Sequence, residues 1–418
     1  MKAAVYHLFF LLAIPTIGFS HVQVGIGKTD ITPSIETPSA GYTERKGEGM
    51  QGVHDPLLAI ALFIDNRERQ IALCSVDHLG FTYEMVQKVT QKIHTYPELK
   101  ECEIFIASSH THSGGGAYLN IPFLGAALAG PYSPNTTQFY IDQTADAIFQ
   151  AYQQQTPAKI EIGYGKAENI SKYRGLWPKD IFPLSDVAIL KITHPDDRPL
   201  AVFFNYPVHP TILNSQNRLF SADFVGYARE HLQEALGTTI QPIYFNGAQG
   251  DIIPVLFDEN DLFNACDLLA QSLANTVKQI WDATVAEDTL EIETQKESYT
   301  FTPQANPFGL ALPVNIYQSE MNLIIFNQLH AFLTMPGELS CLYDKRLKEI
   351  GQKLGFTHVS IFGLTNDAHG YIISPESWQH KTFESNLCFG GENYGNITEK
   401  RAEKLLKNQA PSRRIKKI

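Results

Sequence analysis

Two histidines stand two positions apart in Ser-Ser-His-Thr-His-Ser-Gly-Gly-Gly, residues 108–116. On an extended chain His110 and His112 leave the same face, so both can present an imidazole nitrogen to one ion. Imidazole is a ligand that suits zinc, and the glycines at 114–116 leave room for a substrate to approach the backbone. The same pattern also fits a hydrogen-bonded histidine pair at a strand end, so the motif alone leaves both interpretations open.

Two further residues of ligand type follow apolar runs elsewhere in the chain. His209 lies in Pro-Val-His-Pro, a rigid turn. Glu338 follows Pro336 and Gly337, where a lone carboxylate would be unfavourable to bury. Two histidines and a carboxylate with one open position form a catalytic zinc pattern. One Zn²⁺ per chain would lower the pKa of a bound water to ~7 and polarise a carbonyl, which predicts hydrolysis.

The elements that must position these residues are short apolar runs, each ending in a polar loop. Six runs have the length and composition of buried strands: 71–76, 103–108, 200–206, 240–245, 330–335 and 358–364. Four stretches with helical spacing lie between them: 136–153, 222–236, 261–282 and 339–354. We therefore predict an α/β fold with a mixed, largely buried β-sheet flanked by helices. The active site is expected at the carboxyl ends of the strands.

Several longer motifs carry a resemblance to a known family. They are GIGKTDITP from residue 25, AGYxxR at 40–45, GVHDP at 52–56, HTHSG at 110–114, VHPTI and SADFVGYA within 208–228, GDIIP at 250–254, PGEL at 336–339 and NDAHGY at 366–371. In this order they resemble the N-terminal catalytic domain of the neutral (alkaline, non-lysosomal) ceramidases, which are zinc-dependent amidases. The resemblance covers residues 22 to about 395.

The resemblance implies roles for individual residues. The zinc ligands fall on His110, His209, Glu338 and Tyr371. His112, the second histidine of His-Thr-His, is implied as the acid/base. Arg174, in a looser local match, is implied to hold the reacting polar group of the substrate. Tyr371 counts both as a metal ligand and as a catalytic residue.

The chain also departs from the family pattern. It ends before the C-terminal immunoglobulin-like domain that family members carry, so we expect a short form. Phe383 falls where the family has a second active-site tyrosine, which removes one hydrogen-bond donor for a developing oxyanion. Ile253 falls where Gly-Asp-x-Ser-Pro would place a serine, which disfavours a serine nucleophile and leaves the metal-activated water.

Other polar residues near strand ends have two open interpretations. Asp77, Asp223, Asp251 and Asp367 can each accept the second N–H of a metal-bound histidine, or they can cap a helix. For Asp223, which precedes Phe-Val-Gly-Tyr-Ala-Arg-Glu, the helix cap is favoured. We interpret His54 and Asp55 as structural or wall-forming.

The resulting hypothesis is a zinc amidohydrolase that cleaves the N-acyl amide bond of ceramide or a related N-acyl lipid. A zinc hydrolase of another amide or an ester is the alternative, and a non-catalytic lipid-binding protein is the third choice. The apolar segment 118–130 beside the zinc motif could line an acyl-chain path, with Leu124 and Leu128 in it, or could be ordinary core. A peripheral membrane contact is a further expectation.

Composition and the two ends of the chain bear on the class of protein, its compartment and its domain bounds. A net charge of −11 over 418 residues argues against a nucleic-acid partner. Five scattered cysteines without a C-x-x-C pair argue against a disulfide scaffold or a thiolate zinc site. Residues 1–20 are typical of a cleaved export signal, which predicts a secreted or periplasmic protein. The zinc hydrolase domain is predicted at 21–399. Residues 400–418, with eight basic residues and one acidic, are predicted as a frayed basic tail rather than a lipid-binding segment.

Overall fold

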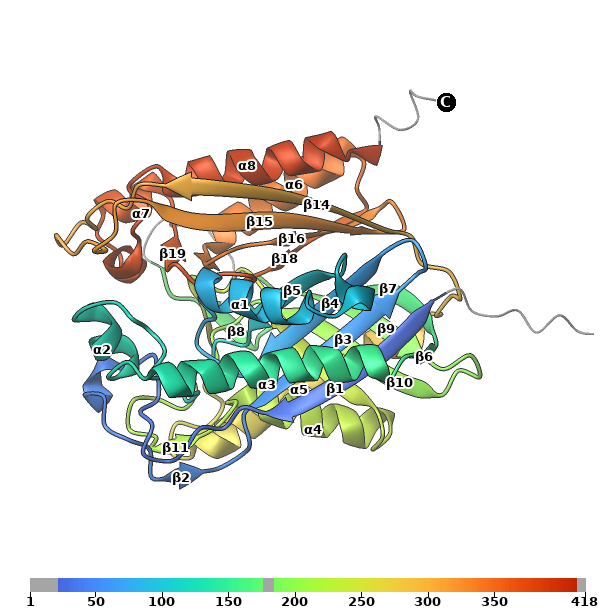
Figure 1. Ribbon diagram of the computed structural model, residues 1–418, viewed down its shortest axis with the longest axis horizontal. Helices are drawn as coiled ribbons and strands as arrows, with labels where there is room; N and C mark the ends of the chain where they lie inside the picture. The colour runs from blue at the N-terminus through green and yellow to red at the C-terminus, as the bar shows by residue number, and fades with distance from the viewer. Residues whose placement is uncertain (1–21, 176–183, 412–418) are drawn as a thin grey trace, which may run out of the picture.

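The computed structural model describes residues 22–175 and 184–411, in which three larger sheets carry helices on their outer faces (Figure 1). The first sheet has the order β5-β4-β3-β1-β6, formed by Glu103–Ser108, Gln70–Val76, Leu58–Asp65, Gln23–Asp30 and Thr156–Pro157. Strands β4 and β5 are parallel and the other pairs are antiparallel. Helices α1 (Tyr83–Ile93) and α3 (Pro134–Gln153) cover its outer face.

The second sheet lies behind the first and has the order β12-β10-β9-β7, formed by Gln241–Asn246, Pro199–Tyr206, Asp186–Thr193 and Lys159–Lys166. Helices α4 (Phe224–Leu236) and α5 (Leu262–Ala283) cover its outer face. In β10, Phe204 packs toward these helices and Phe203 packs toward the first sheet. Both faces are therefore buried, which is why the run is continuously apolar.

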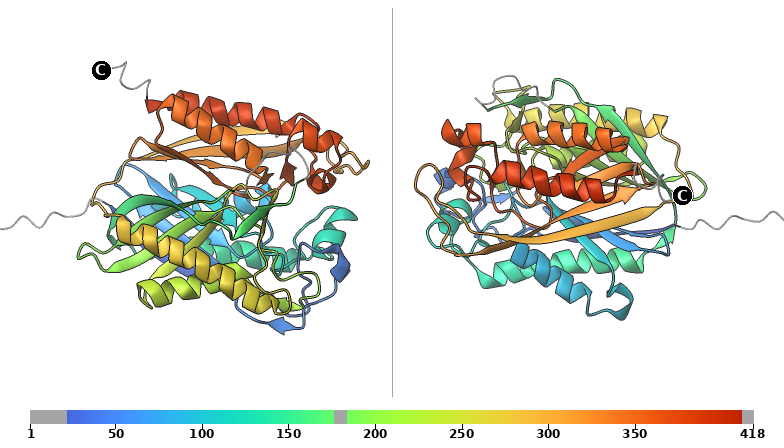
Figure 2. Two further views of the ribbon diagram at one scale, coloured as in Figure 1. Left: turned by 180° about the vertical axis from the view of Figure 1, so that it is seen from behind. Right: turned by 90° about the horizontal axis from the view of Figure 1, so that it is seen from above.

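The third sheet closes one side of this sandwich (Figure 2). Its order is β14-β15-β16-β18, formed by Ile292–Phe301, Tyr317–Phe326, His330–Thr334 and His358–Phe362. Helices α6 (Cys341–Leu354) and α8 (Tyr394–Asn408) pack on its outer face. Phe332 and Phe362 reach from its inner face into the core shared with the other two sheets.

Short elements cluster around the carboxyl ends of the long strands. Three of them are two-stranded ladders: β2 (Gly52–Val53) with β11 (Leu219–Phe220), β8 (Ser171–Tyr173) with β13 (Ile252–Pro254), and β17 (Glu338–Leu339) with β19 (Tyr371–Ile372). The others are the helices α2 (Leu124–Ala129) and α7 (Pro375–Gln379) and the 3-10 turn η3 (Phe383–Leu387). Helices α2 and α7 lie at the same end of the molecule in all views (Figures 1 and 2). The candidate site is built at this end.

The outer edge of β5 is covered by a distant segment, residues 364–366. Asn366 accepts a hydrogen bond from the amide of Ile106 through Oδ1 (2.8 Å) and donates from Nδ2 to the carbonyl of Ile104 (3.0 Å). The amide of Ser108 donates to the carbonyl of Leu364 (3.2 Å). The third sheet's connecting loop thus completes the hydrogen bonding of the first sheet.

The sequence prediction of an α/β fold is confirmed, although the strands form several sheets rather than one. All six predicted strands and all four predicted helices are present, with ends displaced by at most two residues. The five cysteines are buried and free, as expected for a chain without a disulfide scaffold. Among the described residues, no helix has the length and apolarity needed to cross a membrane.

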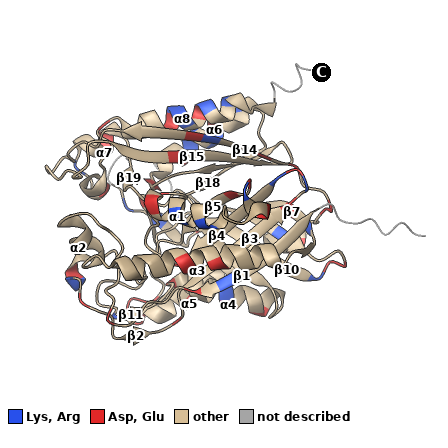
Figure 3. Ribbon diagram, viewed as in Figure 1, with Lys and Arg blue, Asp and Glu red and all other residues tan. Residues whose placement is uncertain are grey.

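The predicted boundary at residue 399 is wrong, because α8 continues across it to Asn408. Leu405 and Leu406 are buried against α6 and the third sheet, so this stretch is part of the domain and not a frayed tail. Lys400, Lys404 and Lys407 are on the exposed side of the helix, where acidic and basic side chains are mixed (Figure 3). Arg401 reaches the third sheet and pairs with Glu297 of β14 (3.0 Å). The predicted export signal, residues 1–20, and the last part of the predicted tail, 412–418, lie outside the described residues.

Candidate metal centre and active site

Three strand ends bring His110, His209 and Glu338 together. His110 follows β5, His209 follows β10, and Glu338 opens β17 just after β16. The carboxylate oxygen Oε2 of Glu338 lies 3.2 Å from Nε2 of His110 and 2.9 Å from Nε2 of His209. All three residues are buried. The structure therefore joins residues up to 228 positions apart in the chain around one point.

Both histidines that face Glu338 are oriented by backbone carbonyls. Nδ1 of His110 lies 2.6 Å from the carbonyl oxygen of Leu79, and Nδ1 of His209 lies 3.1 Å from that of Ile252. A carbonyl can only accept, so in the neutral rings Nδ1 carries the proton and Nε2 holds a lone pair. A backbone carbonyl that accepts the second N–H of the ring is typical of histidines that bind a metal.

His112 differs from the other two histidines in its surroundings. Its Nε2 lies 3.4 Å from Nε2 of His110, and the ligand atoms of His110, His112 and His209 all lie within 4.8 Å of one another. Its Nδ1, in contrast, is buried without a hydrogen-bond partner among the described residues. The cluster thus contains three nitrogens that could hold a metal ion, of which two are oriented by carbonyls.

Tyr371 and Arg174 border the histidine cluster. Tyr371 is the register partner of Glu338 in the parallel ladder of β17 and β19. Its hydroxyl accepts a hydrogen bond from a terminal guanidinium nitrogen of Arg174 (2.9 Å), which also donates to the carbonyl of Gly250 (2.9 Å). Nε of Arg174 donates to the buried carboxylate of Glu384 (2.9 Å). The guanidinium is thereby fixed in orientation beside the phenol.

Phe383 covers Arg174 from the outside. Its ring centroid lies 4.9 Å from Cζ of the guanidinium, and the side chain is 67% exposed. A phenyl ring gives Arg174 a cation–π contact but supplies no hydrogen-bond donor.

Burial and charge set the protonation of the centre. Burial lowers the pKa of His209 to about 4, so its ring is neutral at pH 7, the form that binds metals. Burial alone would raise the pKa of Glu338, but the two facing histidines outweigh it and the pKa lies well below the usual range. Burial raises the pKa of Tyr371 well above its usual range. Two imidazole nitrogens and an ionised carboxylate oxygen therefore face one another, and these are donor atoms that a divalent cation could bind.

The four aspartates near strand ends do not contact the histidines of the cluster. Asp77 forms a buried ion pair with Arg229 (2.6 Å). Asp223 caps α4, as the sequence favoured, by accepting from the amide of Phe224 (2.8 Å). Asp251 accepts from the amide of Cys341 (2.8 Å), and Asp367 accepts from the hydroxyl of Ser319 (2.7 Å). Backbone carbonyls, which sequence patterns do not reveal, hold His110 and His209 instead.

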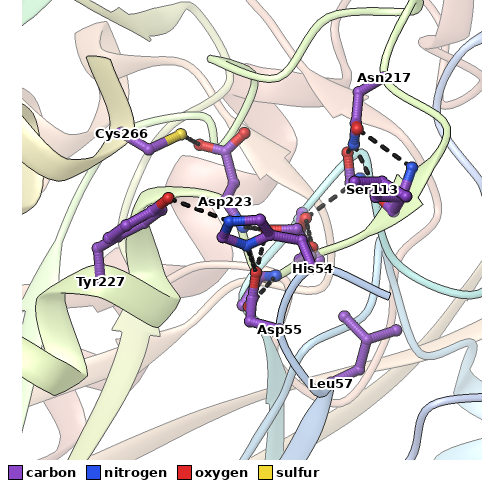
Figure 4. A network of polar contacts seen from close by, with 12 residues as sticks. His54, Asp55, Leu57, Ser113, Asn217, Asp223, Tyr227 and Cys266 are labelled. Atoms are coloured by element: carbon purple, nitrogen blue, oxygen red, sulfur yellow. Dashed lines mark hydrogen bonds and ion pairs between the residues drawn. The ribbon is translucent and has the colours of Figure 1, made fainter. Parts of the chain in front are cut away.

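His54 and Asp55 belong to a network that ties the surrounding loops together (Figure 4). Asp55 accepts hydrogen bonds from the hydroxyl of Ser221 (2.5 Å) and from Nδ1 of His54 (2.8 Å). The His54 ring stacks on Phe263 with centroids 4.2 Å apart, and Nε2 lies 3.3 Å from the hydroxyl of Tyr227. These contacts agree with the structural role predicted for the pair.

The apolar segment 118–130 contains both buried and exposed parts. Tyr118 is buried, while Leu124 and Leu128 on α2 are half-buried and Phe123 is 92% exposed. The carbonyl of Leu128 accepts from the amide of Gly41 (2.8 Å).

Glu384, which accepts from Arg174, is a site residue that the sequence analysis did not identify. The signal that could have found it is a carboxylate directly after Phe383.

The fold and the site define a layered α/β protein with a buried histidine–carboxylate cluster that could hold a metal ion. The family model described as neutral/alkaline non-lysosomal ceramidase, N-terminal, matches residues 22–241. The chain therefore belongs to this family, which confirms the resemblance found in the sequence.

Individual relatives are distant and longer. The chain is similar to neutral ceramidase A of Dictyostelium discoideum, with 28% identity over 225 residues, which is 50% of this chain and 31% of that protein. The neutral ceramidase of Pseudomonas aeruginosa is 26% identical over 224 residues, which is 50% of this chain and 33% of that protein. The matched part thus spans about a third of these relatives.

Solved structures share the fold over most of the chain. The crystal structure of neutral ceramidase from Pseudomonas aeruginosa has a TM-score of 0.83 at 17% identity, covering 92% of this chain and 74% of that chain. A ceramidase complexed with C2 has a TM-score of 0.82 at 17% identity, covering 94% of this chain and 75% of that chain. The layered arrangement of sheets is therefore that of the neutral ceramidases.

Proposed function

We propose that the protein is a zinc-dependent amidohydrolase that cleaves the N-acyl amide bond of ceramide or a related N-acyl lipid. The observation that carries this is the position of Glu338 Oε2 between the Nε2 atoms of His110 and His209. Because the Nδ1 atoms face carbonyls, lone pairs and an anionic oxygen converge, and a divalent cation satisfies all of them.

The donor set fits Zn²⁺, with His110, His209, Glu338 and Tyr371 as the residues that would hold it. Bound there, the ion would supply a water of pKa ~7 and Lewis acidity toward a carbonyl oxygen. Buried nitrogen and carboxylate ligands favour zinc over the hard cations that prefer all-oxygen sites. We propose one ion per chain.

His112 is proposed as the general acid/base rather than a fifth ligand. Its Nε2 lies at the edge of the cluster, within reach of His110 but without the carbonyl partner that orients the two ligating rings. A neutral imidazole here can accept a proton from the attacking water and return it to the amine leaving group. Burial lowers the pKa of His112 well below its usual value, which keeps it in the accepting form.

Arg174 is proposed to bind a polar group of the substrate, either a hydroxyl beside the reacting carbonyl or the oxyanion that forms from it. Glu384 and the Gly250 carbonyl fix the guanidinium, so its donors are preorganised and do not need to reorient during the reaction. Tyr371, which accepts from Arg174, places its hydroxyl at the same side of the cluster.

Exposed apolar side chains around this end of the molecule support a lipid substrate. They include Phe123, Phe308, Ile316 and Phe383, which are between 54% and 92% exposed. Residues near Phe308 lie against the turn that holds Phe383, since Nδ2 of Asn306 donates to the carbonyl of Asn386 in η3. We propose that this rim receives acyl chains and contacts a membrane surface peripherally.

A hydrolase for a different amide or an ester is the second candidate. The specific observation in its favour is Phe383, which leaves the site without the additional phenol that the family resemblance implies. Such an enzyme would use the same metal centre with less stabilisation of the oxyanion.

The deciding experiment measures hydrolysis by purified protein of long-chain N-acyl sphingoid amides, N-acyl amino acids and esters. Each is assayed after chelation and again after zinc is restored. The proposal expects zinc-dependent release of fatty acid from the sphingoid amides, whereas turnover indifferent to chelation would overturn it. We also propose export after removal of residues 1–20, which amino-terminal sequencing of the mature protein would test.

A further inference from the structure

The segment Ala-Gly-Tyr-Thr-Glu-Arg, residues 40–45, packs around His112, and the chemistry proposed above gives it no role. The rings of His110 and His209 are each fixed by a carbonyl at Nδ1. Within the part of the chain that the structure describes, Nδ1 of His112 has no such partner, so the direction of its ring depends largely on packing. The residues that pack against it are those of this segment.

Gly41 forms one wall of the space that the ring occupies. A Cβ at this position would lie 2.5 Å from Nδ1 and 2.7 Å from Cγ of His112, closer than nonbonded atoms can approach. The φ of Gly41 is +106°, a conformation that side chains disfavour. Glycine is therefore required here both for the backbone and for the ring.

Tyr42 forms a second wall. Its ring centroid lies 4.9 Å from that of His112 with an interplanar angle of 56°. Cζ of Arg45 lies 4.9 Å from the same tyrosine ring, so the guanidinium holds Tyr42 against the histidine. The imidazole is thus confined between a backbone and an aromatic face.

Arg45 fixes the backbone of His112 as well. Its guanidinium is buried and donates to the carbonyls of His112 (2.5 Å), Asn214 (3.0 Å) and Ser215 (3.3 Å), and to the hydroxyl of Ser39. Among the described residues, no carboxylate lies within ion-pair distance of Arg45. Burial lowers its pKa to about 10. A fold that needed only stability would gain more here from apolar packing than from an unpaired buried cation.

The residues on either side of His112 are held by separate contacts. The hydroxyl of Thr111 donates to the carbonyl of Ser221 (2.8 Å), and Nδ2 of Asn217 donates to the hydroxyl of Ser113 (2.9 Å) (Figure 4). Ser221 is anchored in turn by Asp55. The neighbouring backbone is therefore rigid, and the ring of His112 depends on residues 41–45 for its direction.

We infer that Gly41, Tyr42 and Arg45 are positioning residues, a bracket that directs Nε2 of His112 toward the reacting atoms. The inference rests on the proposed function, because it assigns the bracket to the proton transfer of that reaction. It predicts that loosening the bracket lowers kcat while zinc stays bound.

The first test compares Gly41→Ala with Gly237→Ala. Gly237 has a similar φ, +119°, but no atom within 4 Å of an added Cβ, so this control carries the backbone strain without the clash. With a short-chain N-acyl sphingoid amide, Gly41→Ala is expected to lose at least tenfold in kcat at unchanged KM and zinc content. Equal kcat in the two variants, or loss of zinc from Gly41→Ala alone, would overturn the inference.

Substitutions of Tyr42 provide a second test, which applies even if Gly41→Ala folds poorly. Tyr42→Ala is expected to lower kcat about tenfold with zinc retained, whereas Tyr42→Phe, which keeps the ring, should restore it. On the residual rate of a His112→Ala variant, Tyr42→Ala should have no further effect, because residues that act as one unit are not additive. Equal effects of Tyr42→Ala in both backgrounds would show that the bracket does not act through His112.

A readout independent of turnover separates the bracket from the proposed function. In protein labelled with ¹⁵N-histidine, Gly41→Ala should shift the ring signals of His112 and leave those of His231 in place, with His112→Gln giving the assignment. His231 is half-buried on α4, where it contacts Asp267 (2.7 Å). Unmoved His112 signals would refute the bracket. If the zinc-loaded wild type hydrolyses no acyl amide, the proposed function fails while this measurement still decides the geometry.

Discussion

Glu338 and Tyr371 lie opposite each other in the parallel ladder of β17 and β19, so their side chains leave the ladder on the same face. Two short strands, β17 after β16 and β19 after β18, thus deliver a carboxylate and a phenol side by side. The His-Thr-His loop and the Pro-Val-His-Pro turn bring imidazoles to the same point.

Metal content should separate the three histidines of the cluster. Purified wild-type protein is expected to hold about one zinc per chain, as for a catalytic site with one open position. His110→Ala and His209→Ala should lose the metal, whereas His112→Ala should keep it and lose turnover. Elemental analysis checks this, and metal-free active protein would contradict the mechanism.

Glu384→Gln should reduce kcat/KM for acyl amides by roughly tenfold, because a charge-assisted hydrogen bond that orients Arg174 is replaced by a weaker neutral one. Glu376→Gln on the exposed surface of nearby α7 is the matched control and should match wild type. Unchanged kinetics for Glu384→Gln would mean that Arg174 needs no buried partner.

Leu124→Asp and Leu128→Asp should raise KM for a long-chain amide and spare a short-chain one. Both leucines are half-buried on α2, and a charge beside an acyl chain is unfavourable. Steady-state kinetics with a series of acyl lengths measures the effect. Equal responses at all lengths would remove α2 from the acyl-chain path.

Phe383→Tyr should increase the rate if a missing hydrogen bond limits it, since one oxyanion donor can contribute ~10²-fold. The substitution retains the aromatic contact with Arg174. Comparison of kcat for amide and ester substrates tests it, and a lower rate on amides with a higher one on esters would favour the alternative hydrolase.

Asp367 should make the protein less stable as the pH rises. Burial raises its pKa from 3.8 to about 7, so the folded state binds its proton more tightly than the unfolded state does. The contribution of Asp367 to the free energy of unfolding is therefore fully present below about pH 4 and is lost as the pH rises toward 7. Asp367→Asn should flatten this part of the pH–Tm curve relative to wild type, whereas exposed Asp288→Asn should not. A parallel curve for Asp367→Asn would contradict the assigned pKa.

The sequence predicted the strands that are continuous apolar runs and missed strands that carry charged or polar residues. Strand β14 mixes polar residues because it lies at the edge of its sheet with much of its surface in water. Strands β9 and β15 are largely buried, but Lys191 interrupts the first and Glu320 and Asn322 interrupt the second. The part of α8 from residue 400 onward reads as a tail in the sequence because its basic residues outnumber the apolar positions that anchor it, Ala402, Leu405 and Leu406. Local composition cannot show that a distant sheet covers those positions.

Part of the candidate site could be predicted because ligand residue types recur at strand ends. His110, His209 and Glu338 were identified in this way, and their convergence is confirmed by the distances between them. The roles of all site residues stay predictions. The carbonyls of Leu79 and Ile252 could not be identified, because any residue can offer a carbonyl and only the fold selects which one.

The cover that residues 364–366 place over β5 has a consequence for incomplete chains. Strand β5 is an edge strand of its sheet. The amides and carbonyls on its open side form hydrogen bonds with a loop that lies more than 250 residues later in the chain. A fragment consisting of residues 22–241 would leave this apolar edge open to pairing with another copy. Fragments of this size are therefore expected to aggregate through β5, and the later half of the chain protects the earlier half from self-association.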